Sequence, residues 1–234
     1  MKTITKITDT FRTLTKFERT LWITSVLSTV LSFALSGGRD YLTLVASLIG
    51  VTALIFVAKG YVIGQILTVV FALFYGVISF FLRYYGEMIT YLGMSAPMAL
   101  AAAIEWIRNP YKGTREVKVR HMTPRLVTLL FASAIAVTAL FYFILRALGN
   151  ASLAVSTLSV TTSWLASALV FLRSPYYALA YAANDLVLIV LWVVASVSDL
   201  SYIPMVVCFV MFFANDMYGF FNWRRMQRKQ ARNA

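Results

Sequence analysis

One acidic residue, Asp185, lies near the middle of an unbroken apolar run, residues 176–196. An ionisable side chain at the depth of a membrane core is costly unless it faces water or a partner, so such residues commonly mark binding sites or ion pathways. Tyr181 and Trp192 precede and follow Asp185 on the same helical stripe. The run therefore predicts a place where a polar group binds within a membrane.

Polar and aromatic side chains recur at helical spacing in other apolar runs, and together they could line one cavity. Aromatic walls with amide and hydroxyl edges suit a stacked heterocycle that carries a polar ring or ribose. A cationic pyridinium would also find aromatic faces and a counter-charge in Asp185. The candidate substrate-binding residues are Tyr181, Asp185, Trp192, Asn215, Tyr218, Asn222, Tyr75, Gln65, Thr161 and Trp164.

Each of these side chains also has a structural interpretation. Thr161 is equally compatible with a bond to its own helix or to a neighbouring helix. Asn215 could pin its helix to another, and Asp185 could be protonated and structural or could carry a transported proton. Trp106 and Trp223 fit the aromatic belt at the membrane surface better than a ligand contact.

An enzyme would need a different set of residues. Intramembrane hydrolases and phosphotransferases require paired acids, a metal-binding His/Cys/Glu set or a serine beside a base. The single histidine, His121, lies in a basic loop, and the single cysteine, Cys208, lies alone in an apolar run. Asp185 and Asp216 lie on different runs without a recognisable catalytic motif. We therefore expect no enzyme activity, no metal and no cofactor.

The composition places the chain in a membrane. Hydrophobic residues make up 60% of it, charged residues make up 13%, and the mean hydropathy is +0.77, whereas globular domains have about 25% charged residues. We expect an all-α integral membrane protein with eight transmembrane helices, because eight apolar stretches approach the length that crosses a bilayer. They are residues 20–35, 41–58, 61–82, 88–107, 126–148, 153–172, 176–196 and 202–223.

The net charge of +12 reflects orientation in the membrane rather than a nucleic-acid partner. If the N-terminus is cytoplasmic, all but three of the 21 Lys and Arg residues fall on the inner side of the eight-span arrangement. The exceptions are Arg39, Arg83 and Arg146. Cytoplasmic loops are enriched in Lys and Arg, so both termini are expected to be cytoplasmic.

The short turns and the tryptophan ends of the apolar segments recur at matching positions in two parts of the chain, as in transporters built from repeats. Trp106 and Trp223 end two similar segments, and the short basic turns Lys59-Gly60 and Arg173-Ser174-Pro175 interrupt them at matching places. Both segments enter from the outside, so the repeats are parallel and one extra span must return the chain. This predicts two parallel three-helix bundles joined by a linking helix (3+1+3), plus an extra N-terminal helix. The expected boundaries are 1–40 for the tail and extra helix, 41–108 for the first bundle, 109–152 for the basic loop and linker helix, 153–223 for the second bundle, and 224–234 for a basic tail.

Several motifs give the chain a family resemblance over residues 20–225. They are the Lys59-Gly60 turn, Tyr75, the loop Tyr84-Tyr85-Gly86-Glu87, Trp106, residues 185–192 and the ending Asn215-Asp216-Met217-Tyr218-Gly219-Phe220-Phe221-Asn222-Trp223-Arg224-Arg225. The chain resembles the PnuC family of bacterial vitamin transporters, which is similar to a full-length version of the SWEET fold. The resemblance implies uptake of nicotinamide riboside by facilitated diffusion, trapping by cytoplasmic phosphorylation, and a homotrimer in the bacterial inner membrane.

One departure from the family pattern concerns the central acid. Relatives often carry a tryptophan four residues before an asparagine, where this chain has Tyr181 and Asp185. An amide donates and accepts hydrogen bonds, whereas an ionised carboxylate only accepts them. The resemblance includes relatives that carry thiamine or riboflavin, so these vitamins are the alternative substrates, and a proton-coupled transporter that uses Asp185 is a further alternative.

The charge distribution makes a topological prediction. In a Cys208→Ser background, single cysteines at Lys118 and Arg228 should react with an impermeant thiol reagent only from the cytoplasm, and one at Asn150 only from outside, because the basic segments stay inside. Labelling of intact cells and inverted vesicles checks this. Reaction of the Lys118 and Arg228 sites from opposite sides would contradict the eight-span topology.

Overall fold

The computed structural model describes residues 10–37, 41–81, 85–150 and 153–233. Long helices dominate these ranges, which contain two isolated β-bridges and no strand. The helices are α2 (Lys16–Leu35), α3 (Tyr41–Ala58), α4 (Val62–Phe81), α5 (Tyr85–Thr90), the π-helical turn η1 (Tyr91–Ser95), α6 (Ala96–Arg108), α7 (Pro124–Ala147), α8 (Leu153–Phe171), α9 (Tyr177–Ser198), the 3₁₀ turn η2 (Leu200–Tyr202) and α10 (Ile203–Arg232).

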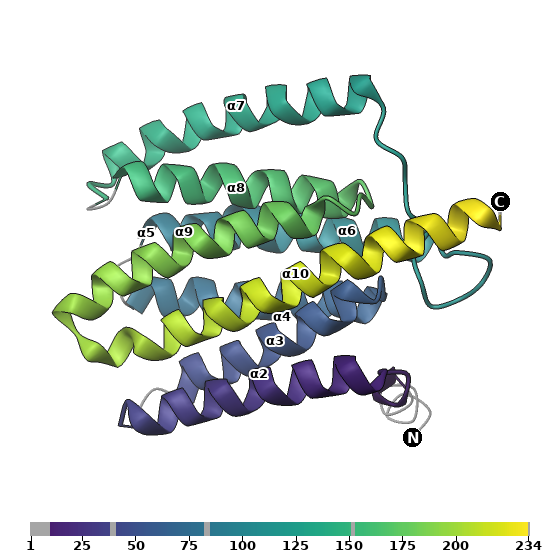
Figure 1. Cartoon of the computed structure of the whole chain (residues 1–234). Coiled ribbons are helices and arrows are strands. Elements are labelled where there is room, and N and C mark those ends of the chain that lie inside the picture. The colour runs from purple at the N-terminus through teal and green to yellow at the C-terminus, as the bar shows by residue number, and fades with distance from the viewer. Residues whose placement is uncertain (1–9, 38–40, 82–84, 151–152, 234) are drawn as a thin grey trace.

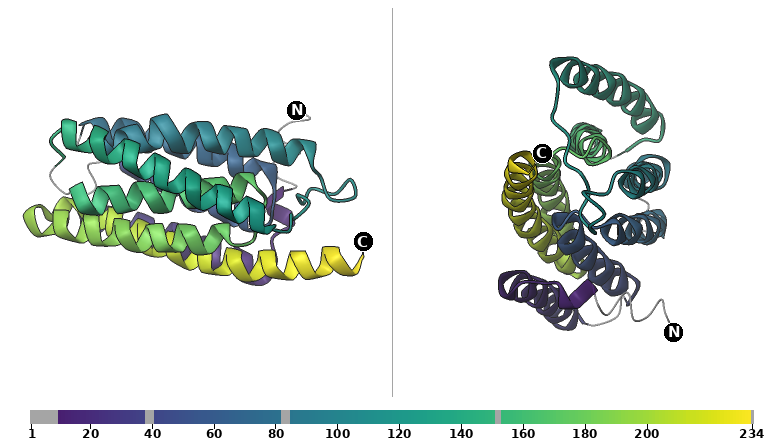
Figure 2. Two further views of the ribbon diagram at one scale, coloured as in Figure 1. Left: turned by 90° about the horizontal axis from the view of Figure 1, so that it is seen from above. Right: turned by 90° about the vertical axis from the view of Figure 1, so that its right-hand side faces the viewer.

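The long helices run side by side along one common direction (Figures 1 and 2). Helix α3 packs on α4 and α4 on α6, while α8 packs on α9 and α9 on α10. Contacts of α3 with α10 and of α6 with α8 join these two groups, which we call the first and second halves. Helix α7 packs on α8, and α2 packs on α3 and α10, at opposite edges of the molecule (Figure 1).

Seven helical segments of the described chain are long and apolar enough to cross a membrane. They are Tyr41–Ala58, Val62–Phe81, Tyr85–Arg108, Pro124–Ala147, Leu153–Phe171, Tyr177–Ser198 and Ile203–Arg232. The expected all-helical membrane protein is therefore confirmed. The expected first span corresponds to α2, which is not among these seven because it is less apolar, so the count of eight stays a prediction.

Polar contacts attach α2 to the rest of the chain. Glu18 in its first turn accepts hydrogen bonds from Lys59 at 2.8 Å and from the Tyr218 hydroxyl at 2.7 Å. The Trp22 indole donates to Thr52 Oγ1 of α3 at 3.1 Å. The buried side of α2 is polar throughout (Glu18, Ser25, Thr29 and Ser32), which explains how a helix of modest hydropathy still docks firmly.

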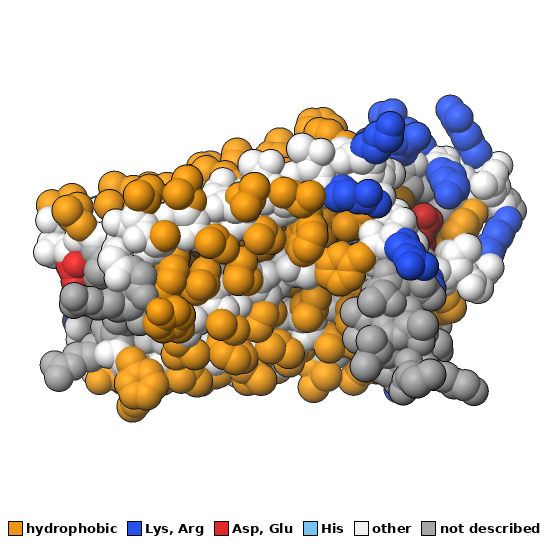
Figure 3. Space-filling view, turned by 90° about the horizontal axis from the view of Figure 1, so that it is seen from below, with side chains coloured by type: hydrophobic (Ala, Val, Ile, Leu, Met, Phe, Trp, Pro, Cys, Tyr) orange, Lys and Arg blue, Asp and Glu red, His pale blue; other side chains and the backbone are white. Residues whose placement is uncertain are grey.

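Basic side chains gather at one end of the molecule, which we call the basic end, and apolar side chains cover the middle (Figure 3). The described parts of both termini reach this end (Figure 1). Arg146, expected on the other side, lies in the last turn of α7 near the outer loop. Arg39 and Arg83, the other two exceptions, lie outside the described residues, as do Lys2 and Lys6.

The two short turns predicted as equivalent share an unusual backbone conformation at the basic end. Gly60 has φ +68° and Arg173 has φ +58°, and this left-handed region is easy for glycine and strained for arginine. Arg173 is held there by its ion pair with Glu105 at 3.3 Å and its bond to Lys118 O at 3.3 Å. Burial lowers the pKa of the Arg173 guanidinium, which nevertheless stays charged beside Glu105.

The segment 109–123 crosses the basic end and ties both turns to α10. The Val117 N–H donates to Gly60 O at 2.9 Å, and the Arg120 N–H donates to Arg173 O at 3.0 Å. The Gln230 side chain accepts from the Val119 N–H at 2.9 Å and donates to Val117 O at 3.0 Å. The basic loop is therefore an ordered bridge between the halves.

The packing of α3 on α4 makes a stability prediction. A Cβ added at Gly64 would lie 2.4 Å from the Val57 backbone nitrogen, so Gly64→Ala must push the two helices apart. We expect a loss of about 1–3 kcal/mol, as for other overpacked sites, measured by thermal unfolding in detergent.

Gly93→Ala is the matched control, because its added Cβ meets nothing nearer than Ile89 Cγ2 at 3.8 Å. The control should retain the unfolding temperature of the unaltered chain. Equal stability of the two variants would show that the α3–α4 contact is looser than described.

Candidate functional site

A cavity of about 60 Å³ lies between the two halves, where α3, α4 and η1 face α8, α9 and α10. Most of its wall is apolar or aromatic, and a few polar side chains converge on it, which is the usual character of a small-molecule site. Its lining residues are Gly50, Ala53, Leu54, Val57, Gln65, Thr68, Phe71, Ala72, Tyr91, Ser95, Ser163, Tyr181, Asn184, Asp185, Phe209, Phe212 and Asp216.

Two acids from neighbouring helices meet at this cavity. The side chains of Asp185 on α9 and Asp216 on α10 lie beside each other at the cavity, and the residues are only 2% and 3% exposed. Two adjacent buried carboxylates repel each other, so we expect the pair to hold at least one proton. Asp185 Oδ2 has no partner within the described part of the chain. It is therefore the polar atom most available to a ligand.

A buried amide is oriented beside these acids. Asn184 Oδ1 accepts hydrogen bonds from Thr162 Oγ1 at 2.9 Å and Ser163 Oγ at 3.0 Å, both on α8. Since its oxygen is occupied, the NH₂ side of Asn184 is the part left to a ligand. Tyr181 is steadied by its hydroxyl contact with Ser167 at 3.3 Å.

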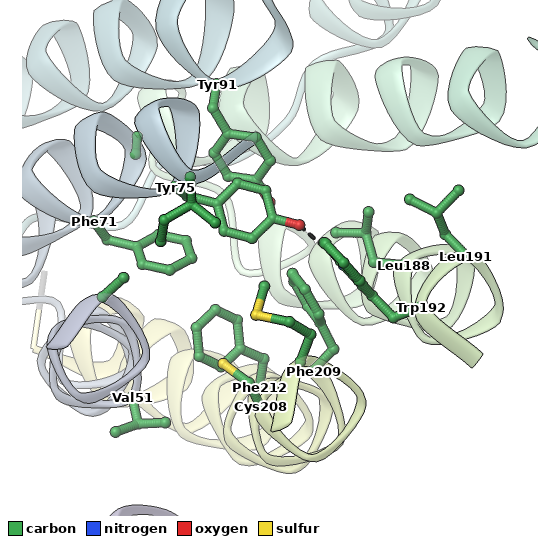
Figure 4. Close-up of a cluster of buried hydrophobic side chains, with 14 of the residues drawn as sticks. Val51, Phe71, Tyr75, Tyr91, Leu188, Leu191, Trp192, Cys208, Phe209 and Phe212 are labelled. Atoms are coloured by element: carbon green, nitrogen blue, oxygen red, sulfur yellow. Dashed lines mark hydrogen bonds between the residues drawn. The ribbon is translucent and has the colours of Figure 1, made fainter. Parts of the chain in front are cut away.

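Aromatic side chains from α4, η1, α9 and α10 form one buried cluster, of which Phe71, Tyr91, Phe209 and Phe212 also line the cavity (Figure 4). Phe71 packs against Phe212 with ring centroids 5.3 Å apart, and against Tyr75 at 5.6 Å. The ring centroids of Tyr75 and Tyr91 are 4.2 Å apart. The Tyr75 hydroxyl accepts a hydrogen bond from the Trp192 indole N–H at 2.9 Å. Tyr75 lies on α4 in the first half and Trp192 on α9 in the second half, so this bond joins the halves.

Two tryptophans, Trp106 and Trp223, make a second contact between the halves, nearer the basic end. The Trp106 indole donates to Val170 O of the second half at 3.1 Å, and the Trp223 indole donates to Val57 O of the first half at 2.9 Å. The two rings also touch, with centroids 5.4 Å apart. Both side chains are at most 1% exposed, so the expectation that they are surface belt residues is wrong. They join the halves instead.

The structure places the predicted site residues in three groups. Gln65, Tyr181 and Asp185 line the cavity. Tyr75 and Trp192 belong to the aromatic cluster behind Phe71 and Tyr91, one layer away from the cavity.

The other predicted site residues point away from the cavity because their helical stripes face different neighbours. Thr161 and Trp164 bond to Thr138 and Ser133 of α7. Asn215 donates to Ser25 of α2 at 2.9 Å, Tyr218 donates to Glu18, and Asn222 donates to Ala58 O at 2.8 Å. These five side chains therefore serve helix packing in this conformation.

Asn184 and Asp216 line the cavity but were not among the sequence candidates. The available signal was simple: each directly adjoins a candidate in sequence, Asp185 and Asn215 respectively, and each is polar within an apolar run. The aromatic lining residues Phe71, Phe209 and Phe212 carried no such signal, since phenylalanine is ordinary in a spanning helix.

Comparison with known proteins identifies the family. Residues 40–225 match the family model described as nicotinamide mononucleotide transporter. The chain belongs to this family. It is 25% identical over 197 residues to the nicotinamide riboside transporter PnuC of Neisseria mucosa, covering 82% of this chain and 75% of the relative. It is 23% identical over 193 residues to that of Haemophilus influenzae, covering 81% and 82%.

A solved structure shares the fold. The crystal structure of the vitamin B3 transporter PnuC aligns with a TM-score of 0.81 at 24% identity, covering 93% of this chain and 94% of that chain. The resemblance to the PnuC family drawn from sequence motifs is therefore confirmed. The family model begins after α2, so the matched family region contains the whole cavity.

The indole bonds at the basic end make a prediction about access. Trp223→Phe keeps the ring and removes the bond to Val57 O, so the halves should separate more easily there. In a Cys208→Ser background, a cysteine at the cavity residue Ser95 should then be alkylated several-fold faster by a small polar reagent.

Trp164→Phe is the matched control, because it also removes one indole bond, to Ser133, but at the α7 contact rather than between the halves. The control should leave the alkylation rate at Ser95→Cys unchanged. Identical rates in both variants would exclude a closing role for the indole pair.

Proposed function

We propose that this protein takes up nicotinamide riboside into bacteria across the cytoplasmic membrane. The observation that carries the proposal is membership in a transporter family whose named relatives are nicotinamide riboside transporters. The cavity between the two halves supports it, because aromatic rings with converging amide and carboxyl groups suit a flat heterocycle joined to a ribose. Membership in this family also favours a transporter over an enzyme.

The cavity chemistry favours the riboside over the mononucleotide named in the family description. A bound phosphate is normally met by Arg, Lys or the N–H groups of a helix start. The described cavity lining contains no Lys or Arg and does contain Asp185 and Asp216. A phosphate placed beside two buried acids would be repelled, so a dephosphorylated substrate fits better.

Contacts between the halves, Tyr75–Trp192 and Trp106–Trp223, lie on either side of the cavity, which suggests how transport proceeds. A volume of about 60 Å³ is far below the roughly 300 Å³ or more of typical ligand pockets, so binding requires the halves to move apart. We infer a 3+1+3 arrangement in which the bundles α3–α6 and α8–α10 rock around the cavity and α7 links them. The Trp106–Trp223 contact would open towards the cytoplasm, and the Tyr75–Trp192 contact towards the outside.

The remaining features of the proposal rest on the resemblance to the PnuC family and on the positions of the Lys and Arg side chains. Both termini are cytoplasmic, with α2 as an eighth span, because the basic end collects the Lys and Arg side chains. The protein is a homotrimer. It works by facilitated diffusion, and cytoplasmic phosphorylation traps the substrate. Thiamine and riboflavin are the alternative substrates within the same family.

A binding comparison on purified protein tests the substrate. Nicotinamide riboside should raise the unfolding temperature, because a ligand stabilises the state that it binds. Nicotinamide mononucleotide should bind at least about tenfold more weakly, since its phosphate meets two acids. Tighter binding of the mononucleotide, or of thiamine or riboflavin, would overturn the proposal.

The contact between Asp185 and Asp216 also keeps a second candidate open, a transporter coupled to protons. Kinase-free vesicles distinguish the two mechanisms. Facilitated diffusion predicts that uptake stops at equal concentrations and accelerates when unlabelled riboside is loaded inside. Accumulation above the outer concentration under a pH gradient would instead establish coupling.

A further inference from the structure

The acid pair at the cavity has no positive partner within the protein. Asp185 and Asp216 touch each other, both line the cavity, and Asp185 Oδ2 makes no hydrogen bond within the described chain. Buried carboxyl groups are ordinarily paired with a cation, a metal or several donors. Glu87 is also buried and has an unpartnered oxygen, but among the described acids only Asp185 and Asp216 line the cavity.

Two other acids of the described chain are each paired with a positively charged side chain. Glu18 pairs with Lys59 at 2.8 Å, and Glu105 pairs with Arg173 at 3.3 Å, both at the basic end. The other ionisable groups that face the acid pair are Tyr91, Tyr181, Tyr177 and Cys208, which supply no positive charge. A ligand or a further proton must therefore neutralise a negative charge on the pair.

The walls around the pair indicate what kind of cation fits. Phe71, Tyr91, Phe209 and Phe212 present aromatic surface, and π faces attract an organic cation. A metal ion would instead need a closer set of ligands, and no group of three or more His, Cys, Asp or Glu residues occurs within the described residues. An aromatic cation can use both the rings and the acids.

We propose that Asp185 and Asp216 act together as the counter-charge for an aromatic cation, so that the cavity selects cationic ligands over neutral ligands of the same shape. The selection rests on the proposed function in one respect, because the pyridinium ring of nicotinamide riboside is such a cation. It goes further by assigning specificity to a pair of acids. One of them, Asp216, directly follows the sequence candidate Asn215 and was not itself a candidate. Two acids sharing one proton carry a single negative charge, which matches the single positive charge of the ring.

A matched pair of ligands tests charge alone. Nicotinamide riboside and its reduced, uncharged dihydropyridine form have nearly the same shape, and binding of each to the purified full-length protein can be measured by calorimetry. We expect the unaltered chain to bind the cation at least about tenfold more tightly, in line with the cost of removing one partner of a buried charge pair. Equal affinities would overturn the inference.

A double variant separates the acids from the aromatic rings. Asp185→Asn/Asp216→Asn removes both charges with almost no change in shape, whereas a single substitution would leave one carboxyl able to ionise. The double variant should lose the preference for the cation and keep its affinity for the reduced riboside, which also shows that the cavity is intact. A preference that survives would assign it to the rings and overturn the role of the acids.

Glu87→Gln is the matched control, because Glu87 is also a buried acid, at 3% exposure, but does not line the cavity. The control should keep the preference of the unaltered chain. An equal loss in Glu87→Gln would show a general effect of removing buried charge and would overturn the assignment to Asp185 and Asp216.

A second ligand pair separates this inference from the proposed function. 1-Methylnicotinamide is a cation and nicotinamide is neutral, and neither carries a ribose. If neither riboside binds but 1-methylnicotinamide is preferred over nicotinamide, the proposed function fails and the charge selection stands. If nicotinamide riboside binds while both pairs show no preference, the proposed function stands and the charge selection is wrong.

Discussion

The rest of this structure depends on one constraint: within a membrane, a polar group must find its partner inside the protein. Three indoles show how the chain meets it. Trp106, Trp192 and Trp223 each donate their N–H to an oxygen on the other half of the molecule. Because water cannot replace these bonds in the core, they decide where the halves touch. The cavity lies between these tryptophan contacts, where the two halves are not packed tightly against each other.

The same constraint separates structural polar residues from those free to act. Thr161, Trp164 and Asn215 look functional in the sequence, yet each meets a polar group on α7 or α2. Asn215 Oδ1 and Asp185 Oδ2 are both buried without a hydrogen-bond partner in the described chain, but only Asp185 lines the cavity, at 2% exposure. An unsatisfied buried group needs an explanation, and a ligand arriving between the halves supplies one.

Transport requires that these contacts break and re-form in turn. Each closing contact consists of one or two indole bonds and ring contacts, which is a modest barrier because a single hydrogen bond contributes only about 1 kcal/mol net. The ordered segment 109–123 and α2 add contacts at the basic end. Helix α2 bonds to both α3 and α10 through Trp22 and Asn215, so it bridges the two halves and resists their separation on that side.

The sequence by itself determined the membrane class, most of the helix positions and the family, and it predicted a repeat. Long apolar stretches can cross a membrane only as helices or closed barrels, and the 117-residue spacing of Trp106 and Trp223 indicated two equivalent halves. It also singled out Asp185, because an acid stands out in an apolar run. Gln65 and Tyr181, which the sequence singled out as polar or aromatic residues at helical spacing, line the same cavity.

Only the tertiary structure decided which face of each helix meets the cavity. Helical periodicity groups Asn215, Tyr218 and Asn222 on one stripe, but it cannot say that this stripe faces α2 and the end of α3 rather than a ligand. In a soluble protein an apolar face would point to the core, whereas in a membrane the lipid-facing side is equally apolar and the usual guide is lost. Asp216 reaches Asp185 because α9 and α10 pack closely there, and that contact between two runs exists only after folding.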